Sequence, residues 1–423
     1  MSTEHSRRSF FKKAGMAGAA GMAAFTNFGT GIERAVAAQS LASSPSALRI
    51  TKIATAFATR SQRRMFVKVE TNQGITGYGE GTDAVVGGYH LSSFLGELLI
   101  GKSPLDVNRL FEDVRRIERD VVFSGAQAGT FVAVLSGLEI ALWDLAGKAL
   151  GLPVYRLLGG KFRDTVHMYT HPRVNNGPIE QIAAACLEAR NKGFDAIKFW
   201  VDQPADPNKQ DVYNNTANRK EMERIVNTVA AVRNAVGDHM EIMVEMHTRF
   251  DLPTAIRLIE EFEPFKPLWV EEPVPAENMD ALREVTQSTN IPICVGENLF
   301  LAHQFQTLLD KKAADIIMPD IQKCGGIGEG QRIANLAHLH YVPFAPHMVS
   351  SPLGMMASAH LCASIPNFLM LESNQGTQYA GVVTDPPVIE NGFLKVSDKP
   401  GIGVDLSEDG LRKIATPGIP FFE

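Results

Sequence analysis

Six ionisable residues stand out because each one ends a short apolar run, and the runs recur at regular intervals. The runs EIMVE, PLWVE, PICVGE, DIIMPD, VPFAPH and FLMLE end at Glu245, Glu271, Glu297, Asp320, His347 and Glu372, so successive ends are 23 to 27 residues apart. Three glutamates brought together in a partly buried place would repel one another, and a hard divalent cation relieves that repulsion. An all-oxygen set made by Glu245, Glu271 and Glu297 favours Mg²⁺, or Mn²⁺, over zinc. The sequence therefore predicts a magnesium site at these three glutamates.

A histidine and an aspartate in the same series indicate acid–base chemistry. Asp320 ends one run and His347 ends the next, so neighbouring strands would bring the two side chains within hydrogen-bonding reach. A carboxylate on one ring nitrogen fixes the tautomer of the imidazole and raises the basicity of the other nitrogen. We therefore predict that His347 is a general base and that Asp320 orients it.

Three further residues extend this chemistry to the elimination of a hydroxyl group. His247 lies two residues after Glu245, so both side chains can face the same side of a strand end. One histidine that removes a proton and a second that protonates a leaving hydroxyl are what a β-elimination needs. A histidine that only supports the metal ligands is the alternative reading of His247. Lys198 could neutralise a substrate carboxylate or a developing enolate, and Glu372, if protonated, could donate a hydrogen bond to that carboxylate.

Three more residues are expected to contact the substrate at the same place. His171 ends the segment VHMYTH, Trp200 ends GFDAIKFW, and Arg249 lies four residues after Glu245. The indole of Trp200 cannot act as a base, so we assign it a binding role only.

The elements that position these residues follow from the spacing of the runs. A run of this length is typical of a buried parallel strand, and the rest of each interval suits a loop and a helix. We expect earlier strands at VHMYTH, from near Thr165, and at GFDAIKFW, ending near Lys198. The amide-rich insertion Asp202–Asn218 would form a loop over the mouth. Repeated strand–helix units predict an α/β fold with a (β/α) barrel, whose active site lies at the carboxyl ends of the strands.

A smaller α+β domain precedes the barrel. Strand-like segments fill Leu48–Glu80 with a turn at 71–74, helical patterning covers roughly 88–117, and a strongly apolar helix spans Phe131–Leu150. Strands followed by helices are typical of an α+β domain. We place this domain at 48–160, the barrel at 161–375, and a C-terminal segment of loops and short strands at 376–423.

The N-terminus has the pattern of an export signal. Ser6-Arg7-Arg8-Ser9-Phe10-Phe11-Lys12 contains a twin arginine, and an Ala/Gly/Met run follows that is too short to span a membrane. Small residues suited to cleavage lie at 35–37. We interpret residues 1–37 as a twin-arginine signal peptide and 38–47 as a linker. The expected location is periplasmic or secreted, after export in the folded state, with no membrane span in the mature chain.

Composition excludes several other classes of function. The formal net charge of −6 gives no basic surface for nucleic acid, so we expect no nucleic-acid partner. The four cysteines contain no C-x-x-C pair and are interpreted as buried thiols. The glycines of 325–330 lack the G-x-G-x-x-G spacing of a dinucleotide-binding loop and are interpreted as turn glycines before a helix.

The chain resembles the mandelate racemase branch of the enolase superfamily over residues 48–423, and most closely the acid-sugar dehydratases of the galactonate dehydratase type. The matching segments are GLEIALWDLAGKALGLPVYRLLGG, GFDAIKFW, VEMHTRF, EFEPFKPLWVEEP, IPICVGEN, MPDIQKCGGI and APHMVSSPLG. The resemblance implies a capping domain, a (β/α)7β barrel and a C-terminal segment that returns to the cap. It also implies an essential Mg²⁺ and abstraction of the proton α to a carboxylate. By that resemblance Glu245, Glu271 and Glu297 are metal ligands, and members of this branch usually form dimers or octamers.

The same resemblance assigns the remaining roles and marks two departures. His347 with Asp320 matches the family's base dyad, Glu372 its electrophilic carboxylate, and His247 the acid of the dehydratases. Lys198 matches the first lysine of a pair whose second member is Trp200 here, which disfavours racemisation. Glu245 stands where aspartate is usual. Specificity in this family depends on capping-domain loops, here at 57–64 and 82–90.

Our hypothesis is a Mg²⁺-dependent dehydratase that converts a small-molecule sugar acid, such as an aldonate, into a 2-keto-3-deoxy acid. A cycloisomerase or epimerase acting through the same enediolate is the alternative. A non-catalytic periplasmic receptor for sugar acids is the alternative from another class.

Overall fold

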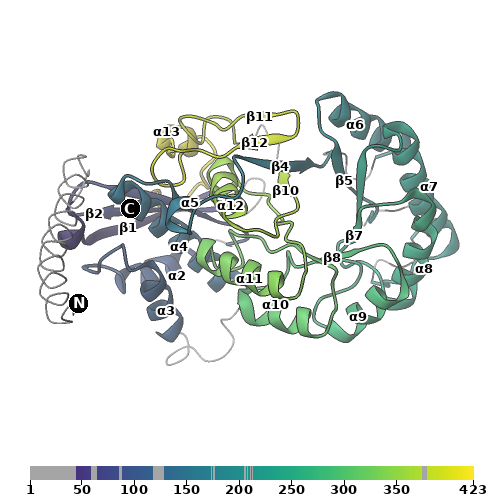
Figure 1. The fold of residues 1–423 in the computed structure, drawn as a ribbon, viewed down its shortest axis with the longest axis horizontal. Coiled ribbons are helices and arrows are strands. Elements are labelled where there is room, and N and C mark those ends of the chain that lie inside the picture. Colours follow the sequence, from purple (N-terminus) through teal and green to yellow (C-terminus); the bar gives the residue numbers. More distant parts are fainter. Residues whose placement is uncertain are drawn as a thin grey trace, which may run out of the picture.

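The computed structural model describes residues 44–58, 64–84, 88–117, 128–172, 174, 177–203, 206, 208–209, 211, 213–373 and 379–423. The predicted signal peptide, most of the predicted linker, and parts of the two predicted specificity loops lie outside these residues. The structure has a capping domain at one end and a barrel at the other (Figure 1). This arrangement confirms the predicted fold class: an α/β barrel with an N-terminal α+β cap.

The capping domain is an antiparallel sheet covered by helices. A short 3-10 helix, η1 (Pro45–Ala47), precedes the sheet, whose strand order is β1-β2-β3. Its strands and helices are β1 (Ile50–Ala58), β2 (Arg64–Thr71), β3 (Thr76–Gly81), α2 (Gly88–Glu97), α3 (Val107–Ile117) and α4 (Gly129–Leu150). The single helical region expected over 88–117 is in fact two helices.

Glycines in β3 allow the sheet and the apolar helix α4 to pack closely. Gly77, Gly79 and Gly81 alternate along β3 and so point to one face. A Cβ on Gly79 would lie 2.1 Å from the carbonyl oxygen of Gly137 in α4, and one on Gly77 would lie 2.3 Å from that of Ala141. Within the described residues α4 is also the one helix whose length and composition would suit a membrane span. Its most apolar window is 83% buried inside the protein, as in the core helix of a domain.

The barrel strands run parallel, with a helix between each strand and the next. Their order is β4-β5-β6-β7-β8-β9, and β10 pairs with β4. The strands are β4 (Thr165–Thr170), β5 (Ala196–Trp200), β6 (Glu241–Glu245), β7 (Trp269–Glu271), β8 (Ile293–Val295), β9 (Ile316–Ile317) and β10 (Leu371–Ser373). The seventh strand position is reduced to single bridges that join Ile317 to Phe344 and Phe344 to Phe368.

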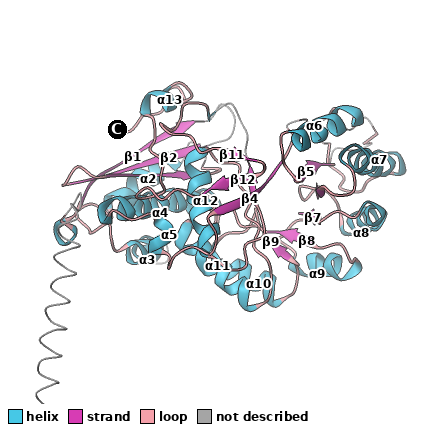
Figure 2. Ribbon diagram, turned by 45° about the horizontal axis from the view of Figure 1, so that its top comes forward, coloured by secondary structure: helices cyan, strands magenta, loops and turns pink. Residues whose placement is uncertain are grey.

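Helices separate the parallel strands in every interval. A short helix, α5 (Val154–Leu157), links cap and barrel, and a 3-10 turn, η3 (Glu263–Phe265), follows α8. The barrel helices are α6 (Ile179–Asn191), α7 (Arg219–Val236), α8 (Leu252–Phe262), α9 (Met279–Ser288), α10 (Leu301–Asp310), α11 (Ile327–Leu339) and α12 (Pro352–Ser364). Seven helices between eight strand positions give the (β/α)7β arrangement, and Figure 2 shows α6 to α9 outside the strands.

Several strands end elsewhere than the sequence suggested. β8 and β9 end at Val295 and Ile317, so Glu297, Asp320 and His347 lie on the loops after their strands. Proline has no amide hydrogen for a strand ladder, and residues 319 and 346 are both proline. β5, by contrast, continues two residues beyond Lys198 to Trp200.

Two carboxylates of the cap accept hydrogen bonds from the N-termini of two barrel helices. Glu139 on α4 accepts hydrogen bonds of 2.7 Å from the backbone amides of Ile327 and Gly328 at the start of α11. Glu80 on β3 accepts one of 2.9 Å from the amide of Ser351, before α12. Acidic groups at these positions satisfy free amides and complement the helix dipole. Since α11 and α12 follow the segments of Asp320 and His347, the docked cap helps to fix both.

The C-terminal segment packs on both domains. It contains β11 (Ile389–Glu390), β12 (Phe393–Lys395), which pairs antiparallel with β4, and a short helix, α13 (Glu408–Arg412), where the sequence indicated only loops and strands. Two backbone hydrogen bonds then reach β1: the amide of Thr416 donates to Phe57 and the amide of Phe422 donates to Thr55. The segment therefore completes the cap, as the fold class predicted.

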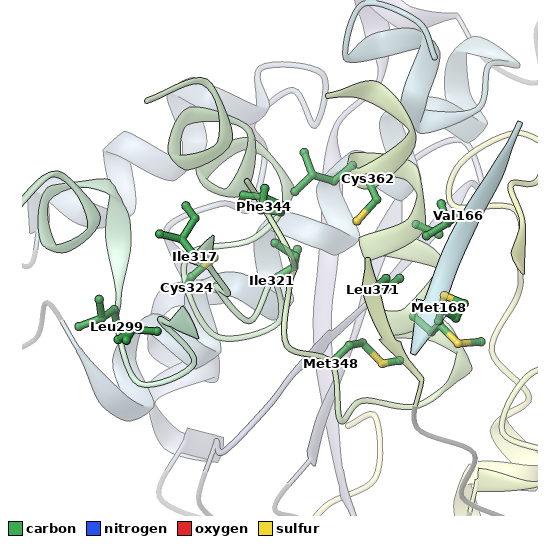
Figure 3. Close-up of a cluster of buried hydrophobic side chains, with 14 of the residues drawn as sticks. Val166, Met168, Leu299, Ile317, Ile321, Cys324, Phe344, Met348, Cys362 and Leu371 are labelled. Atoms are coloured by element: carbon green, nitrogen blue, oxygen red, sulfur yellow. The ribbon is translucent and has the colours of Figure 1, made fainter. Parts of the chain in front are cut away.

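The main apolar core fills the barrel and continues beneath the cap. Figure 3 shows Leu371 of β10 beside Val166 and Met168 of β4, where the last parallel strand meets the first. The four cysteines are all free and buried, as predicted. Burial raises the pKa of each thiol, so these cysteines contribute to packing and have no reactive thiolate.

Candidate active site

Three glutamates form a carboxylate cluster at the mouth of the barrel. Glu245 and Glu271 end the neighbouring strands β6 and β7 in register, and Glu297 follows β8. One oxygen from each lies within 4.8 Å of the others, and within the described residues no other group of His, Cys, Asp or Glu side chains is arranged to hold a metal. Glu272 is not part of this cluster because its Oε1 accepts a 2.8 Å hydrogen bond from the amide of Gly296.

The electrostatics of the cluster indicate an excess of negative charge. Burial raises the pKa of Glu245 to about 7. Burial, followed by the charge of Glu245, raises the pKa of Glu271. The Oε2 atom of Glu245 accepts no hydrogen bond within the described part of the chain. Several carboxylates this close together cannot all be ionised without a compensating positive charge. A hard divalent cation such as Mg²⁺, which prefers oxygen ligands, would supply that charge.

Lys198 supplies a fixed positive charge beside the cluster. Its side chain is 2% exposed, and its Nζ lies 2.5 Å from Glu271, 3.3 Å from Glu372 and 3.5 Å from Glu245. Burial by itself would lower the pKa of this lysine, but Glu271 and then Glu372 hold it well above its ordinary value. Lys198 is therefore a permanent cation and is not available as a base at neutral pH.

His347 and Asp320 form the predicted pair. The Nδ1 atom of His347 lies 2.9 Å from Oδ2 of Asp320, and its Nε2 lies 3.1 Å from Oε2 of Glu297. Asp320 is itself held by the backbone amide of Gln322, which donates to Oδ1 at 2.9 Å. The carboxylate thus fixes the ring, and Nε2 faces the glutamate cluster.

The protonation of His347 depends on its neighbours. Burial would lower its pKa, but the charges of Glu297 and then Glu372 raise the pKa to about 9. The imidazole is therefore protonated at neutral pH while Glu297 is a bare carboxylate. Neutralising the charge of Glu297 would bring the pKa of His347 back towards neutrality, where it can accept a proton.

His247 lies on the loop after β6, two residues beyond Glu245. Its Nδ1 lies 2.6 Å from Oδ1 of Asp202, and its ring meets the indole of Trp200 edge-on at 4.8 Å between centroids. Its backbone amide donates a 2.8 Å hydrogen bond to Oε1 of Glu245. Asp202 was not among the predicted site residues, although Lys198, Trp200 and Asp202 alternate along one strand direction. That alternation was the available signal.

Glu372 is a hydrogen-bond acceptor in this site, and the donor role expected of its protonated form stays a prediction. Burial by itself would raise its pKa, but Lys198 and then His347 lower the pKa to about 2, so the side chain is ionised. Its Oε2 accepts a 3.2 Å hydrogen bond from the amide of Met348, and Nε2 of His171 lies 3.7 Å from Oε1. Glu372 is an acceptor that helps to hold positive charge in the site.

A cavity of about 660 Å³ opens beside Glu297 and His247, and the other two glutamates of the cluster, Lys198 and His347 are not among the residues that line it. Its lining residues are Val174, Trp200, Asp202, Gln203, Asn215, His247, Thr248, Arg249, Glu297 and Asn298. Asp202, Gln203 and Asn215 belong to the predicted mouth loop, so part of that loop lines the cavity. His171 is not among the lining residues of this cavity; its ring stacks on Trp200 with 5.8 Å between centroids, and it lines a smaller cavity. The neutral amide and hydroxyl groups suit the hydroxyls of a polyhydroxy ligand.

These pKa shifts predict how stability depends on pH in protein treated with a chelator. The native state holds protons on His347 up to about pH 9 and on Glu245 up to about pH 7, whereas the unfolded chain loses them near 6.5 and 4.5. Stability from these groups is present below the unfolded pKa values and is lost as the pH rises through the folded ones. We expect the thermal midpoint in EDTA to fall between pH 6.5 and 9, and a midpoint that rises would contradict this. Mg²⁺ should reduce the fall, because its ligands bind as carboxylates.

Two family models and two sequence relatives match most of the chain. The model for the mandelate racemase / muconate lactonizing enzyme N-terminal domain matches residues 38–159, and that for the enolase C-terminal domain-like family matches residues 181–410. A D-xylonate dehydratase from Haloferax volcanii is 38% identical over 383 residues, covering 88% of this chain and 90% of the relative. A D-galactonate dehydratase from Xanthomonas oryzae is 33% identical over 384 residues, with 86% and 94% covered.

A solved structure agrees with these sequence relatives. The mandelate racemase/muconate lactonizing enzyme-like protein from Rubrobacter xylanophilus superposes with a TM-score of 0.85 at 42% identity. The match covers 89% of this chain and 100% of that one.

Proposed function

The chain belongs to the mandelate racemase/muconate lactonizing enzyme family of the enolase superfamily, and on this premise we propose that it is a Mg²⁺-dependent dehydratase of an aldonate-like sugar acid. Relatives that cover most of the chain are dehydratases of D-xylonate and D-galactonate, which supports a carbon–oxygen lyase acting on a sugar acid. The observation that carries the proposal is the carboxylate cluster bordered by two histidines, each with its Nδ1 against an aspartate.

Glu245, Glu271 and Glu297 would hold the cation, and Lys198 lies beside them. When bound, Mg²⁺ would supply positive charge that favours the substrate carboxylate and the charge that develops on it. Lys198 adds a second, permanent positive charge next to the same oxygens.

Two histidines would then divide the proton transfers. His347 takes the C2 proton on Nε2, and the electron pair of the C–H bond moves toward the carboxylate to form an enediolate. His247 gives a proton to the C3 hydroxyl as the C3–O bond breaks and a C2=C3 double bond forms. Water leaves, and the enol product tautomerises to a 2-keto-3-deoxy acid.

A library of aldonates and uronates tests this proposal. Purified protein with Mg²⁺ should form a 2-keto-3-deoxy acid from at least one member, detected by a colour reaction for the keto acid and by mass loss of one water. Tight binding without turnover across the library would favour a receptor instead. Formation of no keto acid from any member would contradict the proposed function.

Trp200 gives a prediction about stereochemistry. By the family resemblance its indole stands where a second lysine would give a base on another face of the substrate, and the pKa of Lys198 is too high for Lys198 to act as a base. With His347 as the one base, a sugar acid should be turned over while its C2 epimer is not. Comparing turnover of the two epimers at saturating Mg²⁺ checks this. Similar rates for both epimers would contradict it.

Export is proposed from the twin-arginine pattern of the N-terminus, which lies outside the described residues. Replacing Arg7 and Arg8 by lysine should retain the protein in the cytoplasm, because that route reads the arginine pair. Cell fractionation of the native and altered chains measures this. Equal periplasmic yields would contradict a twin-arginine signal.

A further inference from the structure

We propose that Asp202 is a positioning residue for the second proton transfer: it holds the imidazole of His247 so that Nε2 presents a proton to the leaving hydroxyl. The inference rests on the proposed dehydratase function. It adds to the site a residue that neither the sequence pattern nor the likeness to relatives had assigned.

The contact itself is short and protected. Oδ1 of Asp202 lies 2.6 Å from Nδ1 of His247, and the aspartate side chain is 6% exposed. Nε2 of His247 makes no hydrogen bond within the described part of the chain, and the residue lines the 660 Å³ cavity. A carboxylate on Nδ1 fixes that nitrogen as the donor to Asp202, so Nε2 is the atom that faces a ligand.

The backbone at His247 is held in place, but it does not set the orientation of the imidazole ring. His247 and Thr248 have φ angles of 47° and 55°, in the left-handed region that non-glycine residues rarely adopt. The amide of His247 donates to Glu245 at 2.8 Å, and that of Thr248 donates to the carbonyl of Glu272 at 2.7 Å. These contacts fix the backbone beside the carboxylate cluster but leave the ring free to rotate. Trp200 meets the ring edge-on, and Asp202 determines its orientation.

The arrangement repeats that of the predicted base. His347 also has Nδ1 on an aspartate, at 2.9 Å from Asp320, and directs Nε2 into the site. The two histidines therefore share one design but come from different segments, which suits a base and an acid acting in sequence. When His247 transfers its Nε2 proton to the C3 hydroxyl, the C3–O bond breaks, C2=C3 forms and water leaves. The Nδ1–H bond to Asp202 is retained throughout.

Within the described residues Asp202 has one other ion pair, and that pair does not explain the placement of the aspartate. Nε of Arg249 lies 3.5 Å from Oδ2, but the arginine side chain is 56% exposed. An ion pair that is half exposed to solvent contributes little. The shorter, better buried contact is the one to His247.

Variants of Asp202 separate the two proton transfers. In D₂O with Mg²⁺ and a sugar acid that the enzyme turns over, Asp202→Ala should lower dehydration about 100-fold, the scale on which orienting carboxylates act. Exchange of the C2 proton should persist, because His347 is untouched. Asp202→Asn, which keeps an acceptor oxygen, should recover part of the loss. Asp211→Asn is the control, because Asp211 is an exposed residue of the same loop whose side chain accepts a hydrogen bond from the amide of Tyr213. Dehydration and exchange in this variant should match those of the native enzyme.

A double variant tests whether Asp202 acts through His247. If it does, Asp202→Ala should cost nothing further in a chain that already carries His247→Asn. Loss of exchange and dehydration in equal proportion, or a further loss in the double variant, would overturn the proposal.

A readout that needs no turnover keeps this inference distinct from the proposed function. Nitrogen-15 NMR of the Mg²⁺-loaded protein, at a pH where the His247 ring is neutral, should show its one remaining hydrogen on Nδ1, and Asp202→Ala should abolish that preference. If the native enzyme formed no keto acid, the proposed function would fail, and this spectrum would still decide whether Asp202 orients His247. An unchanged spectrum in Asp202→Ala would overturn the inference.

Discussion

Replacing His347 with asparagine should lower turnover of the sugar acid by at least about 10³-fold, within the range of a lost general base. No other side chain in the described site can take over: Lys198 has a raised pKa, and His247 has its Nδ1 against Asp202 in another segment. Exchange of the C2 proton with D₂O should disappear together with dehydration. Turnover and exchange measured on the same sample check both expectations.

The control for this variant is an exposed histidine. His239→Asn lies on the turn before β6, away from the cavity, and should keep native turnover. If His347→Asn retained C2 exchange at the native rate, the assignment of the base would be wrong. Since the substrate should still bind, KM should change far less than turnover.

Replacing Glu297 with glutamine should abolish the stabilisation that Mg²⁺ gives the protein. A ligand present at 100 times its Kd stabilises the native state by about 2.7 kcal/mol, so the native chain should show a clear rise in thermal midpoint. The variant lacks one anionic donor of the cluster, and its midpoint should respond little to Mg²⁺. Thermal denaturation and titration calorimetry with Mg²⁺ measure the two effects.

The same variant has a second consequence in the absence of metal. Glu297 lies 3.1 Å from Nε2 of His347 and its charge helps to raise the pKa of that ring to about 9. Glu297→Gln should therefore lower the pKa of His347, which NMR titration in EDTA can follow. Glu284→Gln, on an exposed position of α9, is the matched control and should leave both the Mg²⁺ response and the pKa unchanged. An equal Mg²⁺ response in Glu297→Gln would contradict a metal site at the cluster.

The sequence was sufficient to predict the fold class and the cluster, for a physical reason. Buried parallel strands are continuous apolar runs, so Glu245 and Glu271 could be placed at strand ends directly. The preference for Glu271 over Glu272 followed from the alternation of side chains along a strand. Both inferences depend on local backbone geometry, which short sequence segments determine.

The features that the sequence did not reveal depend on contacts between distant segments. The partnership of Asp202 with His247 spans 45 residues, and the cap carboxylates Glu80 and Glu139 reach helices far along the chain. The ionised state of Glu372 depends on Lys198 and His347 coming together around it. Strand ends at β8 and β9 were misplaced because prolines and a glycine end the ladder before the ionisable residue. No spacing rule gives such contacts in advance.

The most direct test of the account is the fate of solvent deuterium in a single turnover reaction. With Mg²⁺ and a sugar acid in D₂O, the account predicts a 2-keto-3-deoxy acid that has lost the C2 hydrogen and one water and carries one deuteron at C3. Deuterium at C2 of an unchanged or isomerised sugar acid, with no water lost, would contradict it.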